Sequence, residues 1–359
     1  MKIAVVVLNW NTKEYLRSFL PALADSCARM GKGADGSPEA EVIVADSGST
    51  DGSREVLAQE FPCIKTVLLD GNYGYTGGYN RALSELKKQG VEPEYYVLIN
   101  SDIEVDGDWL TPLAFWMDTH PECGICGPKL HGLLRSEGGY VRSKRFEYAG
   151  AAGGMLDRLG YPYCRGRILK TVEDDNGQYD ESEPEVLWVT GSCLMIRRSV
   201  WEALDGLDDR FFAHMEEIDL CWRAQLAGWR VHVIPDSVVW HLGGGTLPPA
   251  SPFKLRLNFR NNLLMLENNL EKTYICGGWT EGGARLKARA KICLRLFLDI
   301  CAGIAYFCTG KTEFAKAVRT AHKEWRQLRR QAPVRPAPAD GAQVFGITDD
   351  IILFKKRTI

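Results

Sequence analysis

The sequence lacks a long apolar run, an excess of charge of one sign and a regular cysteine pattern. No apolar stretch approaches the roughly 18 residues of a transmembrane helix, which excludes a simple membrane span. The 44 basic and 46 acidic residues leave a net charge of −2, so the chain as a whole has no nucleic-acid-binding signature. The 11 cysteines are scattered and odd in number, which indicates reduced thiols in a cytoplasmic protein.

What the sequence does contain is an ordinary globular composition with an uneven distribution of charge. Hydrophobic residues make up 45% and charged residues 25% of its 359 residues, which predicts a globular protein of two domains or one large one. Residues 285–330 hold 12 basic against 3 acidic residues, whereas residues 1–284 are net acidic. This asymmetry indicates an anionic partner. We favour a membrane surface over nucleic acid, because the cations alternate with apolar residues.

The first hundred residues alternate between strand and helix patterns. Runs rich in Val, Ile and Leu end in polar or Gly-rich turns, and helical spacing follows each of the first three runs. This alternation predicts an α/β fold with a parallel sheet covered on both faces, and ligands of such sheets bind at the carboxyl ends of the strands. The predicted strands cover residues 3–10, 41–46, 65–70 and 95–100, and the predicted helices 13–23, 53–61 and 79–90.

Each of these strands ends in residues that could contact a ligand. The Gly-rich loop 71–80 precedes a helix, where backbone N–H groups can approach phosphate, or it is only a turn. It matches neither the dinucleotide-binding nor the P-loop pattern. Asp46 could accept a hydrogen bond from a base imide, or the cluster around it could simply cap the helix at 53–60, a task that Ser49 or Asp51 alone could perform.

Acidic residues at three places are candidates for chemistry. Asp102 and Glu104 directly follow a strand and suit a hard cation such as Mg²⁺ or Mn²⁺, although a solvated acidic turn has the same pattern. Glu216 and Glu217 begin a predicted helix, where they could act as a general base or merely complement the helix dipole. His241 ends the last predicted strand and is a candidate third ligand beside a carboxylate metal site.

The middle and the C-terminal part of the chain differ from the first half. Residues 131–185 predict loops or a short antiparallel insertion, and the pattern is helical from residue 253 onward. Residues 284–308 predict one long amphipathic helix that lies on a bilayer surface, or that packs on the catalytic domain or in a homodimer. Its expected polar face holds Lys287, Lys291, Arg295 and Asp299, and its expected apolar face holds Leu294, Phe297, Leu298, Cys301 and Ile304. The Pro/Ala-rich residues 331–345 predict a loose linker.

The chain resembles the inverting glycosyltransferases of family 2, in their rhamnosyltransferase-like branch. The resemblance covers residues 1 to about 325 and rests on seven segments in order: VVVLNWN, ADSGSTDGS, GNYGYTGGYN, LINSDIEV, WVTGSCLMIRRSVW, FFAHMEEIDLCWRAQLAGWR and WHLGGGT. It implies a GT-A (Rossmann-like) fold with a C-terminal helical extension. We therefore expect a catalytic domain over residues 1–250, a helical and basic region over 251–330, and a linker and tail over 331–359.

The same resemblance implies a substrate class and a location. The donor would be a nucleotide-diphosphate sugar used with Mg²⁺ or Mn²⁺, and the acceptor a saccharide or a polyprenyl-linked saccharide of bacterial cell-surface polysaccharide synthesis. We expect a cytoplasmic protein, with peripheral attachment to the inner face of the cell membrane and a homodimer as further expectations.

The resemblance also implies roles for individual residues. Asp46 would hold the nucleotide base, Asp102 with Glu104 would form the metal motif, and His241, 24 residues after Glu217, would be a further metal ligand. The other donor-binding candidates are Asn9, Asn11, Ser49, Asp51, Asn72, Gly74, Asn80, Asn100 and Arg223, the last of which would hold the diphosphate. The acceptor-binding candidates are Trp188, Thr190, Gly191 and Asp219.

The sequence departs from the family at the general base. The usual base motif is Glu-Asp, whereas this chain has Glu216 followed by Glu217. We expect Glu217 to take the acceptor proton, with the assignment among Glu216, Glu217 and Asp219 left open. The alternative is a catalytically weak or non-catalytic nucleotide-sugar-binding protein of the same fold.

Overall fold

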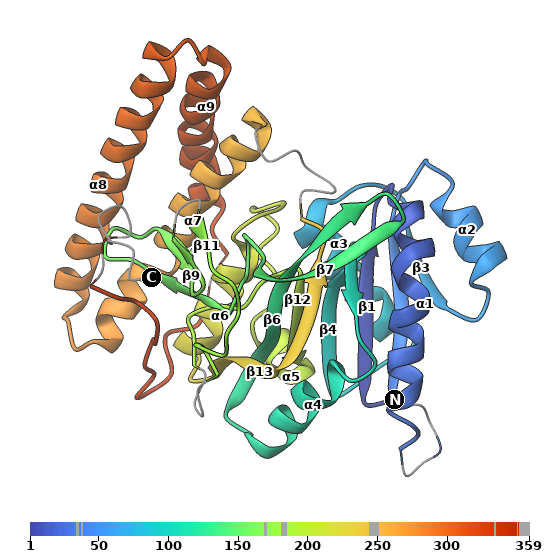
Figure 1. Cartoon of the computed structure of the whole chain (residues 1–359). Coiled ribbons are helices and arrows are strands. Elements are labelled where there is room, and N and C mark those ends of the chain that lie inside the picture. The colour runs from blue at the N-terminus through green and yellow to red at the C-terminus, as the bar shows by residue number, and fades with distance from the viewer. Residues whose placement is uncertain are drawn as a thin grey trace.

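The computed structural model describes residues 1–33, 36, 39–168, 171–180, 185–243, 251–333, 335–349 and 351. The chain in this structure alternates strands and helices up to residue 119, continues through mostly short strands, and ends in long helices (Figure 1). In order, the elements are β1 (Ile3–Asn9), α1 (Lys13–Arg29), β2 (Ala40–Ser47), α2 (Ser53–Glu60), β3 (Lys65–Leu69), α3 (Gly74–Lys88), β4 (Tyr95–Asn100), β5 (Ile103–Val105), α4 (Leu110–Thr119), β6 (Cys123–Ser136), β7 (Gly139–Phe146), β8 (Gly154–Leu156), β9 (Pro162–Cys164), β10 (Arg167–Ile168), β11 (Thr171–Val172), β12 (Cys193–Arg197), α5 (Arg198–Ala203), α6 (Glu216–Leu226), β13 (Arg230–His241), α7 (Pro252–Cys276), α8 (Glu281–Cys308), α9 (Thr312–Leu328) and the 3₁₀ turn η1 (Arg329–Gln331).

The main sheet is parallel in its first half and mixed in its second. Its strand order is β3-β2-β1-β4-β12-β6-β13-β5, with β7 beside β6. The strands β1 to β4 pair in parallel, which confirms the prediction made from their alternation with helices. The strand β12 runs antiparallel to both of its neighbours, and β5 runs antiparallel to β13. Asn9 at the end of β1 is level with Asp46 of β2, so the polar strand ends meet at one edge of the sheet.

Helices cover both faces of the sheet because alternate strand residues point in opposite directions. In β1, Val5 belongs to the apolar cluster that contains Leu20 of α1, whereas the next residue, Val6, belongs to the cluster that contains Leu83 of α3. Both valines are completely buried. The near-continuous apolar runs of the first strands therefore reflect burial on two sides.

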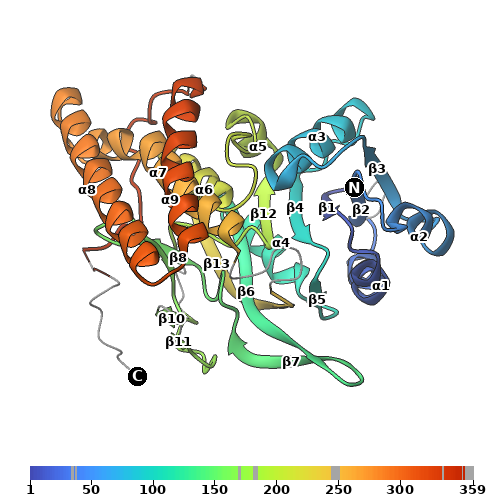
Figure 2. The same cartoon turned by 90° about the horizontal axis from the view of Figure 1, so that it is seen from above.

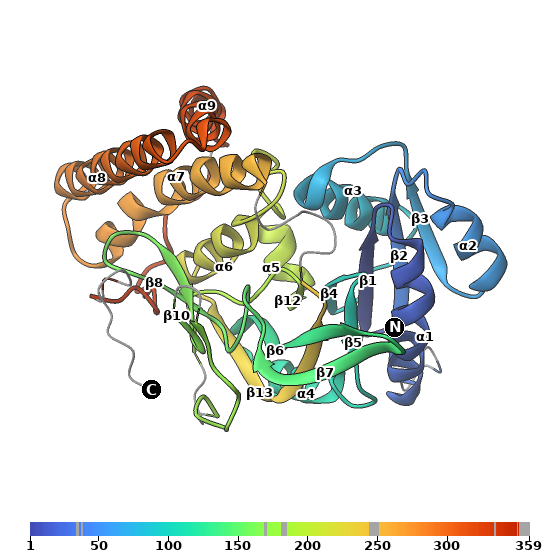
Figure 3. The ribbon, with the colours of Figure 1, turned by 45° about the horizontal axis from the view of Figure 1, so that its top comes forward.

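The middle of the chain forms the antiparallel insertion that the sequence predicted. The strands β6 and β7 form a long antiparallel hairpin, and β8 with β9 and β10 with β11 form two small antiparallel pairs. The turn of the hairpin at residues 137–138 lies on the side of the molecule that carries α1 (Figure 3).

Three helices occupy the end of the molecule opposite α2. The helix α7 packs against α6, and α8 and α9 pack against α7 and against each other (Figure 2). They confirm the helical pattern predicted from residue 253 onward. Among the described residues, no helix is both long enough and apolar enough to cross a bilayer.

The Pro/Ala-rich segment after α9 runs back along the catalytic part of the chain. Residues 335–349 are described, and several of their backbone groups bond to the body of the protein. The amide of Ala339 donates to the carbonyl of Leu226 at 2.9 Å, and the amide of Phe345 donates to the side-chain oxygen of Gln225 at 2.6 Å. The expectation of a loose linker is therefore wrong for this segment, because specific partners hold it in place.

Candidate active site

The first part of the site is a buried network around Asp46 at the end of β2. One carboxylate oxygen of Asp46 accepts from the side-chain amide of Asn9 at 2.8 Å. The other accepts from the backbone amide of Ser49 at 3.0 Å and from Nε of Arg54 at 2.7 Å. Asp46 is fully buried, so these donors offset the cost of placing its charge inside the protein. A contact between Asp46 and a nucleotide base remains a prediction.

The loops after β1 and β2 lock onto each other. The amide of Asn11 donates to the hydroxyl of Ser49 at 2.9 Å, and Asn11 has a positive φ of 55°. Asp51 accepts from the amide of Lys13 at 3.0 Å and from the hydroxyl of Ser53 at 2.6 Å. Asp51 therefore ties the first turns of α1 and α2 together, which fits the capping interpretation of this residue.

The Gly-rich loop before α3 docks on a second loop. The backbone amides of Tyr75 and Thr76 both donate to the carbonyl of Phe212, at 2.8 and 3.2 Å. These N–H groups belong to the loop that was predicted to approach phosphate, and in this structure they donate to a carbonyl of the protein. A Cβ on Gly74, whose φ is +68°, would lie 2.5 Å from the same carbonyl, so the close approach requires glycine.

The two asparagines of this region also bond within the protein. The side-chain oxygen of Asn72 accepts from the amide of Gly74 at 2.8 Å. Asn80 donates to the carbonyl of Leu207 and to Asp209, both at 2.8 Å. Their predicted contacts with a donor nucleotide stay predictions. The same is true of Asn100, whose backbone N–H donates to the carbonyl of Ser192 at 2.9 Å.

Asp102 and His241 meet where β5 pairs with the end of β13. Nε2 of His241 lies 3.2 Å from a carboxylate oxygen of Asp102, and Nδ1 lies 3.7 Å from a carboxylate oxygen of Glu147. All three side chains are buried. Burial lowers the pKa of His241, but the two carboxylates outweigh burial and raise that pKa to about 10. Glu104 instead makes an ion pair with Nε of Arg142 at 2.7 Å.

The Asp102–His241 pair suits a divalent cation as a partial ligand set. It offers one carboxylate and, once a cation has displaced the proton of His241, one imidazole. Nδ1 of His241 faces Glu147 and has no hydrogen-bond partner among the described residues. No described group of three or more His, Cys, Asp or Glu side chains is placed to hold an ion. The cation would therefore need oxygens from substrate phosphate and water, as Mg²⁺ sites commonly do.

The loop before α6 is strained. Phe212, His214 and Met215 have positive φ values of 65°, 70° and 71°, which cost about 1–3 kcal/mol each in non-glycine residues. The amide of Asn261 in α7 holds this loop by donating to the carbonyls of residues 211, 213 and 214 at 3.0, 2.8 and 2.7 Å. Strained backbone of this kind persists only where surrounding contacts fix it. The loop leads directly into α6, so its conformation sets the positions of Glu216 and Glu217.

Glu217, the predicted general base, lies in the first turn of α6 beside Gly191, where an added Cβ would be 3.3 Å from Cβ of Glu217. One of its carboxylate oxygens is buried without a hydrogen-bond partner among the described residues. Burial raises the pKa of Glu217 to about 7, and burial together with the charge of Glu217 raises the pKa of the neighbouring Glu216 well above its ordinary value. Tyr75 donates its hydroxyl to the carbonyl of Gly191 at 2.5 Å and so supports the same position.

Three of the predicted acceptor-binding residues form hydrogen bonds or ion pairs within the protein. The indole of Trp188 donates to the carbonyl of Met155 at 3.2 Å, and the hydroxyl of Thr190 donates to the carbonyl of Ala149 at 3.0 Å. Asp219 is fully buried against Arg223 at 2.7 Å. Despite burial, Arg223 and Arg335 keep the pKa of Asp219 at about 2.

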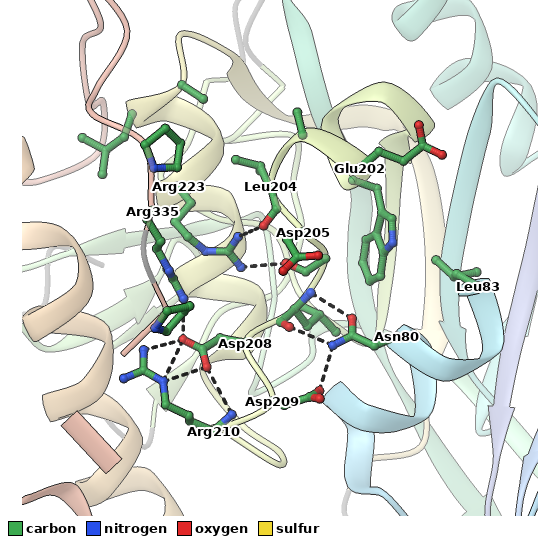
Figure 4. Close-up of a pocket in the computed structure, with 18 of the residues that line it drawn as sticks. Asn80, Leu83, Glu202, Leu204, Asp205, Asp208, Asp209, Arg210, Arg223 and Arg335 are labelled. Carbon is green, nitrogen blue, oxygen red and sulfur yellow. Dashed lines mark hydrogen bonds and ion pairs between the residues drawn. The ribbon is translucent and has the colours of Figure 1, made fainter. Parts of the chain in front are cut away.

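Arg223 lines a cavity of about 800 Å³ (Figure 4). Its guanidinium donates to the carbonyls of Leu204 and Gly206 at 2.8 and 2.9 Å as well as to Asp219. The walls of this cavity do not include Asp102, Glu217 or His241. A smaller cavity of about 540 Å³ is lined by His241 and Glu147. The predicted contact between Arg223 and the diphosphate stays a prediction, and each of its three guanidinium nitrogens already donates one hydrogen bond within the protein.

Sequence reasoning missed Glu147, His214 and Asn261. Glu147 follows β7, and no strand pattern linked it to His241. His214 lies two residues before Glu216, and burial lowers its pKa to about 4, so its imidazole is neutral with Nε2 unpartnered among the described residues. Asn261 lies in α7, 45 residues after Glu216. The sequence signal for Asn261 is a polar residue just before the apolar run 263–266 of a predicted helix.

Comparisons with known proteins agree with this geometry. The family model described as glycosyl transferase family 2 matches residues 4–203. The N-acetylglucosaminyl-diphospho-decaprenol L-rhamnosyltransferase of Mycobacterium tuberculosis is 27% identical over 310 residues, which span 83% of this chain and 92% of that protein. The rhamnosyltransferase WbbL of Escherichia coli K12 is 41% identical over 169 residues, which span 46% of this chain and 59% of WbbL. A crystal structure of GalNAc-T7 with UDP, GalNAc and Mn²⁺ matches with a TM-score of 0.50 at 16% identity, covering 73% of this chain and 47% of that one, which supports the fold alone.

Proposed function

The chain belongs to glycosyl transferase family 2, and we propose that it transfers L-rhamnose from a nucleotide-diphosphate donor to a polyprenyl-diphosphate-linked N-acetylglucosamine. The relative from M. tuberculosis supports this choice, because its printed name gives that sugar and that class of acceptor and its similarity spans 83% of this chain. The similarity to WbbL supports the same sugar. The reaction belongs to cell-surface polysaccharide synthesis and takes place on the cytoplasmic side of the membrane.

The observation that carries the proposal is the environment of Glu217. Its unpartnered carboxylate oxygen and its pKa of about 7 suit a general base that works near neutral pH. Glu217 takes the proton of the acceptor hydroxyl while the oxygen bonds to the anomeric carbon. The bond from that carbon to the diphosphate breaks in the same step, and the nucleoside diphosphate leaves with the electron pair. A single displacement of this kind inverts the anomeric centre.

Other residues bind and orient the substrates. Asp102 and His241 would hold a divalent cation, which supplies charge neutralisation for the leaving diphosphate when bound. The buried network of Asn9, Asp46 and Ser49 forms the floor on which we place the nucleotide base.

A transfer assay with a donor panel tests the proposal. The protein is incubated with Mn²⁺, a short-chain polyprenyl-diphosphate-linked N-acetylglucosamine and, in turn, dTDP-L-rhamnose, UDP-hexoses and GDP-mannose. We expect a rhamnosylated lipid from dTDP-L-rhamnose alone, with an inverted anomeric centre by NMR. Transfer from another donor would replace rhamnose in the proposal. Donor binding without transfer or hydrolysis would establish the non-catalytic alternative instead.

A further inference from the structure

The helix α8 packs part of its predicted polar face against the protein. Arg295 and Asp299 of that face expose only 3% and 1% of their side chains. They form an ion pair at 3.3 Å, and His322 of α9 lies 3.3 Å from the second oxygen of Asp299. The guanidinium of Arg295 also lies 3.4 Å from the ring centroid of Tyr161. The sequence did not predict which side of α8 faces the protein, and these partners hold its charged pair inward.

The opposite side of α8 presents large apolar side chains to solvent. At 100° per residue, the exposed large apolar residues and cysteines of α8 lie within an arc of roughly 140° and extend over about 33 Å of helix. We call this set the outer stripe. Its exposed fractions range from 42% for Leu294 to 71% for Leu286. The outer stripe consists of Leu286, Leu294, Phe297, Ile300, Ile304 and Phe307, together with the exposed cysteines Cys293, Cys301 and Cys308.

No described element covers the outer stripe. The helix α8 lies at the outside of the molecule, with α7 and α9 on its inner side (Figure 3). The alternative in which the apolar face packs on the catalytic part of the same chain is therefore excluded for the described residues. A contiguous apolar surface of this size on a folded protein indicates an interaction site.

The charges beside the outer stripe favour an anionic lipid surface as the partner. Lys287 and Arg289 border the stripe on its two sides and are exposed, and Arg285 is exposed one turn before Arg289. The acidic residues of α8 are Glu281 at its first position and the buried Asp299. In two copies packed stripe to stripe with their helices parallel these like charges would meet, whereas anionic headgroups would neutralise them.

An aromatic residue at the start of α8 fits the same partner. Trp279 is 47% exposed, and the ammonium of Lys287 lies 4.1 Å from its ring centroid. Tryptophan and lysine are the side chains that concentrate at the boundary between headgroups and acyl chains. The stripe covers one side of the helix only, which suits a helix lying in the plane of the interface.

We propose that the outer stripe of α8 binds the surface of an anionic phospholipid bilayer, with α8 parallel to the membrane plane. The contact is independent of the proposed sugar transfer, since it requires neither donor nor acceptor. Its apolar side chains enter the acyl boundary while Arg285, Lys287 and Arg289 meet the phosphates.

Co-sedimentation with vesicles tests the contact directly. We expect the full-length protein to pellet with phosphatidylglycerol vesicles at low salt, and much less at high salt or with phosphatidylcholine. The double variant Phe297→Glu/Ile304→Glu should bind at least tenfold more weakly, since it places two charges in the apolar contact. Phe115→Glu is the matched control, because Phe115 of α4 is equally exposed at 66% and lies outside the stripe. Unchanged thermal melting shows that the variants are folded.

The native cysteines provide a second readout on the unaltered protein. Phosphatidylglycerol vesicles should slow maleimide labelling of Cys293, Cys301 and Cys308, but not of the exposed Cys63, which follows α2 at the other end of the molecule. Absence of pelleting at low salt, equal pelleting of the double variant, or uniform labelling overturns the proposal. A dimer in light scattering that the double variant dissociates would assign the stripe to a second copy of the chain instead.

Discussion

At the scale of single residues, Glu217 combines two properties that pull against each other. Burial raises its pKa to about 7, which suits a base, and the same burial makes its ionised form costly to the folded protein. Glu217→Gln should lower the transfer rate by about 10²–10⁴-fold. In the wild type, the rate should fall as the pH drops below about 7, because the protonated carboxyl cannot accept a proton.

The stability of the same variant should change in the opposite direction. The unfolded carboxyl ionises near its ordinary value of 4.5 and the folded one only near 7. Ionised Glu217 therefore destabilises the wild type fully above pH 7 and not at all below pH 4.5. Glu217→Gln should gain about 1–3 kcal/mol at pH 8 and nothing at pH 4 in urea unfolding. Glu216→Gln is the comparison variant in the transfer assay. Activity of Glu217→Gln within a few-fold of wild type, with Glu216→Gln inactive, would transfer the role of base to Glu216.

Asn261 should act on catalysis through the strained loop. Its amide holds the carbonyls of residues 211, 213 and 214, so Asn261→Ala removes the contacts that hold Glu217 in place. We expect kcat to fall at least tenfold with little change in donor affinity. Asn262→Ala is the matched control, because Asn262 is also buried in α7 but donates to the carbonyl of Gly160 at 2.9 Å. Both variants should lose about 1–3 kcal/mol of stability. An equal kcat in the two would show that Asn261 has only a structural role.

At the scale of helices and strands, the sequence predicted what depends on local pattern. The strands β1 to β4 could be predicted because burial on both faces gives continuous apolar runs, and their polar ends were expected to meet because parallel strands end at one edge. The closeness of Asp102 and His241 depends instead on the antiparallel pairing of β5 with the end of β13. The orientation of α8 could not be predicted, since it depends on Tyr161 and His322, which are distant in sequence.

The Pro/Ala-rich segment shows a further limit of local pattern. Its composition is that of a linker, yet Arg335 lies beside Asp208 and, at 3.3 Å, beside Asp219. Arg335→Ala should cost about 1–3 kcal/mol in urea unfolding, because it removes one of the cations that balance two buried carboxylates. Arg330→Ala, which changes an exposed arginine just before the segment, should cost less than about 0.5 kcal/mol. Equal effects of the two substitutions would show that Arg335 does not fasten the segment.

At the scale of the whole molecule, binding at the strand ends should stabilise the entire chain. Asp102 lies in the turn between β4 and β5, and His241 ends β13, in the same sheet as β1 and β2, whose ends carry the proposed nucleotide site. A ligand that joins the two sites therefore favours the folded state of both halves. Mn²⁺ together with dTDP or UDP at about 100 times the dissociation constant should add about 2.7 kcal/mol. This gain corresponds to a rise of several degrees in Tm.

The metal dependence of this stabilisation discriminates between the candidate ligands. EDTA should abolish most of the rise, and so should Asp102→Asn or His241→Ala, because the two side chains lie 3.2 Å apart and would share the cation. Glu104→Gln should keep the rise, since the ion pair with Arg142 holds Glu104 away from that role. If Glu104→Gln loses the metal-dependent shift while His241→Ala retains it, the ligand pair is Asp102 with Glu104, and Arg142 must release its partner when the cation binds.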